Sequence, residues 1–177
     1  MTGILGAILA GGQSRRFGSD KAEALLDGRR LIDWARDGLQ GHVERIVICG
    51  RADGIPDRPH AGLGPLGGIN AALHHARVIG LNTVITVPCD APALPDGIIA
   101  RLCASSMQAH LAALPVVGRW DVGWADLLDQ HLEGPERSIR GWACRIGSMG
   151  LEGGSGIANI NTREDLERMI FGDGGDG

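Results

Sequence analysis

The chain has 177 residues, a net charge of −4 and a hydrophobic content of 44%. These values fit one folded domain, which we expect over residues 1–171, followed by a disordered tail at 172–177 that contains only Gly and Asp. The negative charge argues against a nucleic-acid surface, and no apolar run is long enough to span a membrane.

The cysteines and the first residues both indicate a cytoplasmic protein. The cysteines form no Cys-x-x-Cys pair and have no histidine spaced for zinc, so we expect reduced thiols at Cys49, Cys89, Cys103 and Cys144. Residues 4–10 are apolar and no basic segment precedes them. They are therefore typical of a buried strand rather than of a signal peptide.

Strand and helix signals alternate along the chain. Apolar runs predict strands at residues 4–10, 43–49, 83–87, 111–117 and 157–160. Amphipathic patterns or opening prolines predict helices at residues 31–40, 66–79, 95–105, 122–133 and 136–143, with a last helix from Thr162. The alternation predicts an α/β fold with a largely parallel sheet flanked by helices.

A glycine-rich, basic segment follows the first predicted strand. It reads Gly11-Gly12-Gln13-Ser14-Arg15-Arg16-Phe17-Gly18-Ser19-Asp20-Lys21. At the carboxyl end of a strand, glycines present backbone N–H groups to phosphate, and basic side chains add charge-assisted hydrogen bonds. The pattern is neither a Walker A loop nor a dinucleotide-binding fingerprint. We interpret it as another kind of phosphate-binding loop; a basic surface turn is the alternative.

Lys21 is the only lysine among 17 basic residues. A chain that uses arginine everywhere else indicates a chemical need for a compact ammonium at this position. A chance occurrence is the alternative interpretation.

Asp90 follows the central predicted strand, in the sequence Pro88-Cys89-Asp90-Ala91-Pro92. A carboxylate at this place faces the same edge of the sheet as the glycine-rich segment. Mg²⁺ is commonly held by one or two carboxylates together with substrate phosphates, so Asp90 is the best candidate metal ligand. Its alternative role is to cap the next turn.

Two further segments are candidates for the same edge. Gly64-Pro65-Leu66-Gly67-Gly68 opens a predicted helix and would let a nucleotide base approach the backbone closely. Asn159 and Asn161 lie two residues apart on a predicted strand, where both amides would share one face. Cap and turn hydrogen bonding is the alternative for these two asparagines.

Aromatic and imidazole side chains give weaker signals. Trp120 and Trp124 have helical spacing, and we expect them to pack in the core rather than to form a stacking platform. His74 and His75 are adjacent on a predicted helix, so their side chains diverge and cannot bind one metal ion together.

Four sequence blocks together resemble the molybdenum cofactor guanylyltransferase family, MobA. They are the Leu9–Ala22 block with its Gly-Gly and Asp-Lys-Ala elements, Pro65-Leu66-Gly67-Gly68, Pro88-Cys89-Asp90-x-Pro92 and Asn159-Ile160-Asn161-Thr162. The blocks stand in the family's order. The first block is more similar to the guanylyl enzyme than to related cytidylyl and sugar-phosphate enzymes.

The resemblance implies a Rossmann-like nucleotidyltransferase fold, GTP and Mg²⁺, and a molybdopterin-type cofactor as acceptor. It also implies partner proteins of cofactor biosynthesis and molybdoenzyme maturation. The implied nucleotide-binding residues are Leu9, Ala10, Gly11, Gly12, Lys21, Asp57 and Asp90. The implied catalytic residues are Lys21, Asp90 and Arg15, with Asp90 also the metal ligand and Asn159 and Asn161 at the acceptor.

Two alternatives remain open at this point. The chain could be a related nucleotidyltransferase that uses CTP or a sugar-phosphate acceptor. It could also be a catalytically inactive relative that binds a nucleotide, although such a protein would not need to retain both Lys21 and Asp90.

Overall fold

The computed structural model describes residues 3–11, 21–51, 53–153, 160 and 165. The strands are β1 (Ile4–Leu9), β2 (Leu25–Leu26), β3 (Arg29–Arg30), β4 (Arg45–Cys49), β5 (Thr83–Pro88), β6 (Ala109–Leu111), β7 (Leu114–Asp121) and β8 (Met149–Leu151). The helices are α1 (Leu31–Leu39), α2 (Pro65–Val78), α3 (Ile98–Ala104), α4 (Ala125–Glu133) and α5 (Ile139–Arg145), with short 3₁₀ turns η1 (Lys21–Glu23) and η2 (Val122–Trp124). Of the helices described, none combines the length and apolar character needed to cross a membrane.

The described residues form one six-stranded sheet in the order β4-β1-β5-β7-β6-β8. β4, β1 and β5 are mutually parallel, β7 is antiparallel to both of its neighbours, and β6 is parallel to β8. All strands of this sheet except β7 therefore point the same way. The predicted α/β fold with a largely parallel sheet is confirmed.

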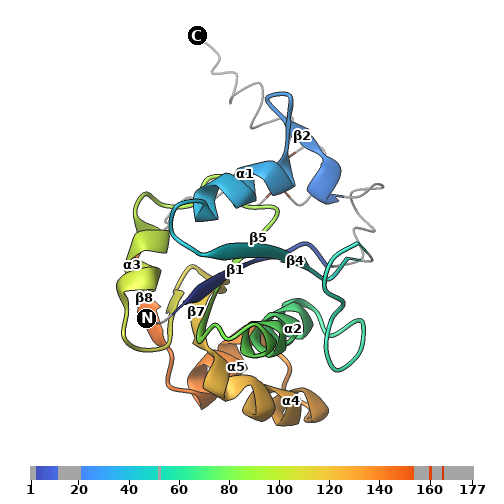
Figure 1. Ribbon diagram of the computed structural model, residues 1–177, viewed down its shortest axis with the longest axis vertical. Coiled ribbons are helices and arrows are strands. Elements are labelled where there is room, and N and C mark those ends of the chain that lie inside the picture. The colour runs from blue at the N-terminus through green and yellow to red at the C-terminus, as the bar shows by residue number, and fades with distance from the viewer. Residues whose placement is uncertain (1–2, 12–20, 52, 154–159, 161–164, 166–177) are drawn as a thin grey trace.

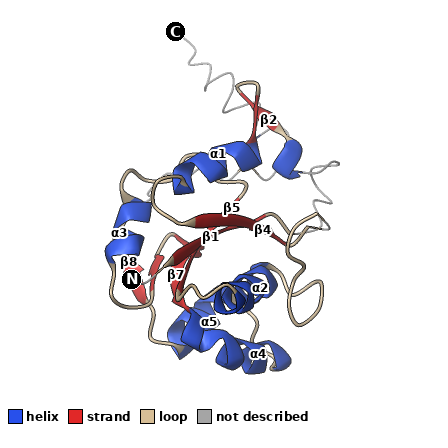
Figure 2. Cartoon of the chain, viewed as in Figure 1, coloured by secondary structure: helices blue, strands red, loops and turns tan. Residues whose placement is uncertain are grey.

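Helices cover both faces of the sheet, as Figures 1 and 2 show. α1 and α3 lie on one face, and α2, α4 and α5 lie on the other. β2 and β3 form a separate hairpin beside η1 and α1. Asp27 and Gly28 join its strands with positive φ angles of 51° and 74°, as a two-residue hairpin turn requires.

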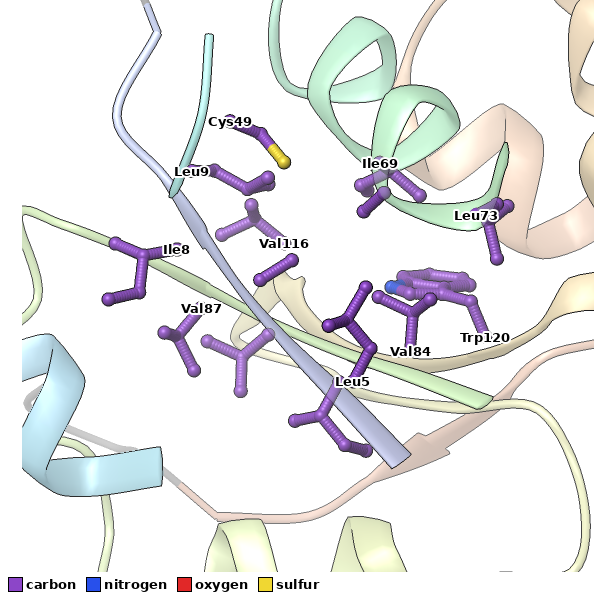
Figure 3. Packing of buried hydrophobic residues seen from close by; sticks show 14 of the residues in the cluster. Leu5, Ile8, Leu9, Cys49, Ile69, Leu73, Val84, Val87, Val116 and Trp120 are labelled. Carbon is purple, nitrogen blue, oxygen red and sulfur yellow. The ribbon is translucent and has the colours of Figure 1, made fainter. Parts of the chain in front are cut away.

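The core is built from alternate side chains of the buried strands. Ile8 and Val87 lie on the α1 side of the sheet, whereas Leu9 and Cys49 face α2 (Figure 3). Trp120 of β7 is fully buried on the α2 side, and its indole N–H donates to the Thr86 hydroxyl at 2.8 Å. This hydrogen bond satisfies the polar end of a large side chain that otherwise contributes apolar packing.

The prediction of one strand at 111–117 is wrong. β6 ends at Leu111, residues 112–113 turn, and β7 begins at Leu114 and continues to Asp121. The two alanines in this turn interrupt neither the apolar run nor its spacing, so the sequence gives no turn signal. Because the hairpin between β6 and β7 reverses the chain, the sheet contains both parallel and antiparallel neighbours around β7.

Other elements differ mainly at their ends. α3 begins at Ile98, because Gly97 adopts a left-handed conformation with φ 71° after the predicted start at residue 95. α5 runs from 139 to 145 rather than from 136 to 143, and Ser138 caps it by accepting from the Gly141 N–H. β8 was not predicted from the sequence. The predicted strand at 157–160 and the tail at 172–177 lie outside the described residues, except for Ile160; the predicted last helix does too, except for Asp165, which is helical.

Candidate active site

Lys21 and Asp90 meet beside the carboxyl ends of β1 and β5. The Lys21 Nζ atom lies 2.6 Å from Asp90 Oδ2, and the two side chains are 14% and 24% exposed. Lys21 begins η1, and Asp90 lies in the turn that follows β5. Because a partly exposed ion pair stabilises a fold by only about 0–1 kcal/mol, both charges remain available to exchange with a ligand.

The end of β1 gives the second part of the site. The Ala10 N–H donates to the Cys49 carbonyl at 3.0 Å, and the Leu9 carbonyl accepts from the Cys89 N–H at 3.1 Å. These bonds extend the parallel pairing past the end of the strand and fix the backbone that leads into Gly11. Gly12 and Arg15, also predicted site residues, lie outside the described residues.

Asp57 lies close to the same edge, among glycines. A side chain at Gly67 would come within 3.1 Å of the Asp57 carboxyl carbon, and one at Gly50 would come within 3.3 Å of its Oδ1. Burial raises the pKa of the Asp57 carboxyl above its ordinary value, and a hydrogen bond from the Gly62 N–H opposes this in part. The two glycines thus let the backbone pack closely against this partly buried carboxyl, whose oxygens can accept N–H donors.

Cys49 lies beside Leu9 in the hydrophobic core (Figure 3). Its side chain is fully buried at the end of β4, and burial together with the Asp57 charge raises the pKa of the thiol to about 12. The thiol therefore stays protonated at neutral pH and acts as a small apolar side chain rather than as a nucleophile. All four cysteines carry free thiols, as predicted.

The acceptor candidates, Asn159 and Asn161, lie outside the described residues. Ile160 between them is described: its N–H donates to the Asp90 carbonyl at 3.0 Å, and its side chain is buried against Leu26 and Leu31. The chain therefore passes directly beside Asp90 at this position.

A different group of metal-type ligands lies between α2 and α4. One ligand atom from each of His74, Asp126 and Asp129 lies within 4.8 Å of the others. The Asp129 carboxylate binds His74 and the guanidinium of Arg58, while Asp126 forms an ion pair with Arg77 at 2.8 Å. These contacts join α4 to α2 and to the loop that carries Arg58, so we interpret the group as a contact between elements of the fold.

Trp120 and Trp124 both pack in the core, as predicted. Trp120 is fully buried and Trp124 is partly buried against the core cluster, so neither forms a stacking platform.

Sequence reasoning missed Gly50 and Arg51, which follow β4 at the same edge as Gly11. The available signal was a glycine and a basic residue directly after a predicted strand.

Comparison with known proteins agrees with this geometry. Residues 6–128 match the MobA-like NTP transferase domain family. The chain is 35% identical to a molybdenum cofactor guanylyltransferase of Acidiphilium cryptum, over 93% of each chain.

Solved structures give the same fold. The molybdopterin-guanine dinucleotide biosynthesis protein A of Archaeoglobus fulgidus superimposes with a TM-score of 0.72 at 23% identity, over 94% of this chain and 97% of that one. A 2-C-methyl-D-erythritol 4-phosphate cytidylyltransferase of Thermus thermophilus gives a TM-score of 0.68 at 13% identity, over 93% and 96% of the two chains. The fold is thus shared across enzymes with different nucleotides, whereas the sequence match is to the guanylyltransferases. The chain belongs to the MobA-like NTP transferase family and is a nucleotidyltransferase related to the molybdenum cofactor guanylyltransferases.

Proposed function

We propose that this protein transfers GMP from GTP to a molybdenum–molybdopterin cofactor, which yields the guanine dinucleotide form of the cofactor and pyrophosphate. The observation that carries the proposal is the contact between Lys21 and Asp90 at the carboxyl ends of parallel strands. An ammonium and a carboxylate at this edge are the groups needed to bind a triphosphate and its metal ion. The similarity to named guanylyltransferases supports the choice of base and acceptor.

The reaction is an in-line displacement at the α-phosphate. A terminal phosphate oxygen of the acceptor forms a bond to the α-phosphorus, the bond from that phosphorus to the bridging oxygen of the β-phosphate breaks, and pyrophosphate leaves with the bonding electron pair. No covalent enzyme intermediate is needed. The protein accelerates the step by positioning both substrates and by neutralising the charge that develops, which we assign to Lys21, to Arg15 and to backbone N–H groups of the glycine-rich segment that begins at Gly11.

Asp90 is the residue that would hold Mg²⁺. Its carboxylate offers hard oxygen ligands, and a single carboxylate together with phosphate oxygens is a common Mg²⁺ environment. Bound there, the ion would withdraw negative charge from the phosphates of GTP. In its absence, Lys21 neutralises the carboxylate, so the same pair keeps the site from carrying an unpaired negative charge.

The two substrates are assigned to opposite sides of Asp90. Asp57 lies against Gly50 and Gly67, and its carboxylate fits the N–H donors on the edge of guanine. Asn159 and Asn161 are assigned to the acceptor, because Ile160 between them binds the Asp90 backbone. The substrates would therefore meet at Asp90. We also propose a cytoplasmic location, together with contacts to proteins of cofactor biosynthesis and molybdoenzyme maturation.

The test is pyrophosphate release with each of the four NTPs, with and without molybdopterin-bound molybdenum. We expect release with GTP only when the acceptor is present. GTP with Mg²⁺ should also raise the melting temperature more than the other NTPs, because a ligand that binds only the native state stabilises it. Preference for CTP would support the cytidylyl alternative, and binding without turnover would support the inactive relative.

A further inference from the structure

Two consecutive residues after β4 contact both flanks of the glycine-rich segment. Gly50 lies against Gly11, where the segment leaves β1, and Arg51 binds Glu23 of η1, the turn that begins with Lys21. Gly11 and Lys21 are ten positions apart in the sequence. The turn after β4 therefore joins two points that are separated along the chain.

The contact between Gly50 and Gly11 is made by backbone alone. A side chain at Gly50 would place its first carbon 2.5 Å from Gly11 Cα and 2.7 Å from Gly11 N, a separation that real atoms do not tolerate. Gly50 also has a φ of +84°, a conformation that other residues rarely adopt. Its N–H donates to the Ile55 carbonyl at 2.8 Å, so the position of Gly50 is fixed from both sides.

The contact between Arg51 and Glu23 is electrostatic. The Arg51 Nη2 atom lies 3.5 Å from Glu23 Oε1, and Arg51 Nε donates to Asp53 Oδ1 at 2.9 Å. The Arg51 side chain is only 16% exposed, which restricts its motion. Glu23 is also held by Arg30 of the β2–β3 hairpin at 3.2 Å, so η1 is tied to two elements through one carboxylate.

The same turn contacts the Asp57 region. The first side-chain carbon of a larger residue at Gly50 would lie 3.3 Å from Asp57 Oδ1. Three candidate binding residues, Gly11, Lys21 and Asp57, are thus positioned relative to one another through Gly50 and Arg51. None of these contacts needs a bound ligand.

We propose that Gly50 and Arg51 are positioning residues that set the place of Lys21 relative to the end of β1, and with it the affinity for the triphosphate. This inference rests on the proposed function, because it assumes that an NTP binds at this edge. Arg51 acts through Glu23 on η1, and Gly50 acts on Gly11. Loss of the Arg51 contact weakens binding of the phosphates and leaves the nucleoside end of the site intact, whereas a side chain at Gly50 would also approach Asp57.

The experiment compares Arg51→Met and Glu23→Gln with the control Arg45→Met. Arg45 begins the same strand at its opposite end and is exposed, so its replacement removes the same charge far from the site. Binding is measured for the NTP that the native protein turns over best and for the matching nucleoside. We expect NTP binding about fivefold weaker in both Arg51→Met and Glu23→Gln, as fits the loss of one partly exposed ion pair, with nucleoside binding and the control unchanged.

The double variant tests the route of the effect. Because Arg51 and Glu23 act through one contact, the double variant should bind the NTP no more weakly than the worse single variant. Additive losses, an equal loss of nucleoside binding, or the same loss in Arg45→Met would overturn the proposal. Gly50→Ala should weaken NTP binding at least about tenfold, because the added carbon forces Gly11 to move.

The test of Gly50 and Arg51 does not depend on which nucleotide base the protein prefers. If the native protein prefers CTP, the same variants are compared with CTP and cytidine, and the proposed guanylyl activity fails while the positioning role is still decided. If Gly50→Ala does not fold, Arg51→Met and Glu23→Gln decide alone, since both keep a side chain of similar length and add no atom where the backbone leaves no room.

Discussion

The two halves of the sheet differ in strand direction: the β4-β1-β5 half is entirely parallel, whereas the β7-β6-β8 half contains the one reversed strand of this sheet, β7. In the β4-β1-β5 half, the strands are parallel, and their carboxyl ends bring Gly11, Gly50 and Asp90 to one edge. In the β7-β6-β8 half, β7 runs the other way, so its carboxyl end at Asp121 pairs with Thr83, at the start of β5. The first half collects glycines and charges, whereas the second buries Trp120 and Trp142.

Because of this difference, the candidate ligand contacts lie in one half of the sheet and the large buried side chains lie in the other. Loops after parallel strands meet at a single edge, so a few short segments can converge there on one ligand. The loop after a reversed strand lies at the opposite edge of the sheet from this site. β7 therefore contributes buried packing rather than ligand contacts. Variants in the first half should lose activity with little loss of stability, and variants in the second should do the reverse.

The largest expected effect is that of Asp90→Asn. The change keeps the shape of the side chain and removes the charge assigned to the metal ion. We expect turnover to fall about a thousandfold, or about 4 kcal/mol of transition-state stabilisation, in a protein with a nearly native melting temperature. Pyrophosphate release and thermal unfolding measure the two quantities.

Asp96→Asn is the matched control for Asp90→Asn. Asp96 is exposed in the same connection between β5 and α3, and its replacement should leave turnover unchanged. Near-native turnover of Asp90→Asn at limiting Mg²⁺ would show that Asp90 does not hold the metal ion.

Trp120→Phe tests the packing half. The change removes the hydrogen bond to Thr86 and leaves a cavity in a fully buried site, so we expect a loss of about 2–3 kcal/mol in the free energy of unfolding. Turnover per folded molecule should stay native. Trp124→Phe, at a partly buried position, should cost less than about 1 kcal/mol. A loss of NTP affinity in Trp120→Phe would show that packing in the second half of the sheet also affects the binding site.

Lys21→Arg sharpens the chemical assignment within the first half. Arginine keeps the charge but is a wide planar fork, which needs more room between η1 and Asp90 than a compact ammonium does. We expect turnover to fall about tenfold, or about 1.4 kcal/mol, and Lys21→Ala to be worse. The position also allows a direct measurement, because an amine-reactive nucleotide analogue can label only Lys21 or the N-terminus. Labelling of Lys21 that GTP does not block, or native turnover in Lys21→Arg, would show that the lysine has no special role.

The parallel half was far easier to predict than the mixed half. β1, β4 and β5 are largely apolar runs, and a glycine or an aspartate follows each of them within two residues, so their ends could be recognised from residue type. The β6–β7 hairpin turns at alanines, and β8 has three residues, so neither leaves a pattern. The pair Lys21–Asp90 could be predicted because each follows a strand of the same sheet. The contacts of Gly50 and Arg51 could not, since they depend on which strands are neighbours.

The smallest expected effect is the pH dependence that Asp57 confers on both binding and stability. Burial raises the pKa of its carboxyl above the ordinary value of 3.8, so the folded protein holds the proton more tightly than the unfolded chain does. As pH rises from 3.8 through this higher pKa, the folded state therefore loses stability, and the ionised form that accepts N–H donors from the base becomes populated. Asp57→Asn removes the titration: we expect weaker GTP binding at neutral pH, no loss of stability there, and an acid limb of GTP affinity that no longer depends on this group. Calorimetric titrations across the acid range measure the limb, and thermal unfolding at the same pH values measures the stability. An acid limb that is the same in the native protein and in Asp57→Asn would show that another group controls it, and would remove Asp57 from the nucleotide site.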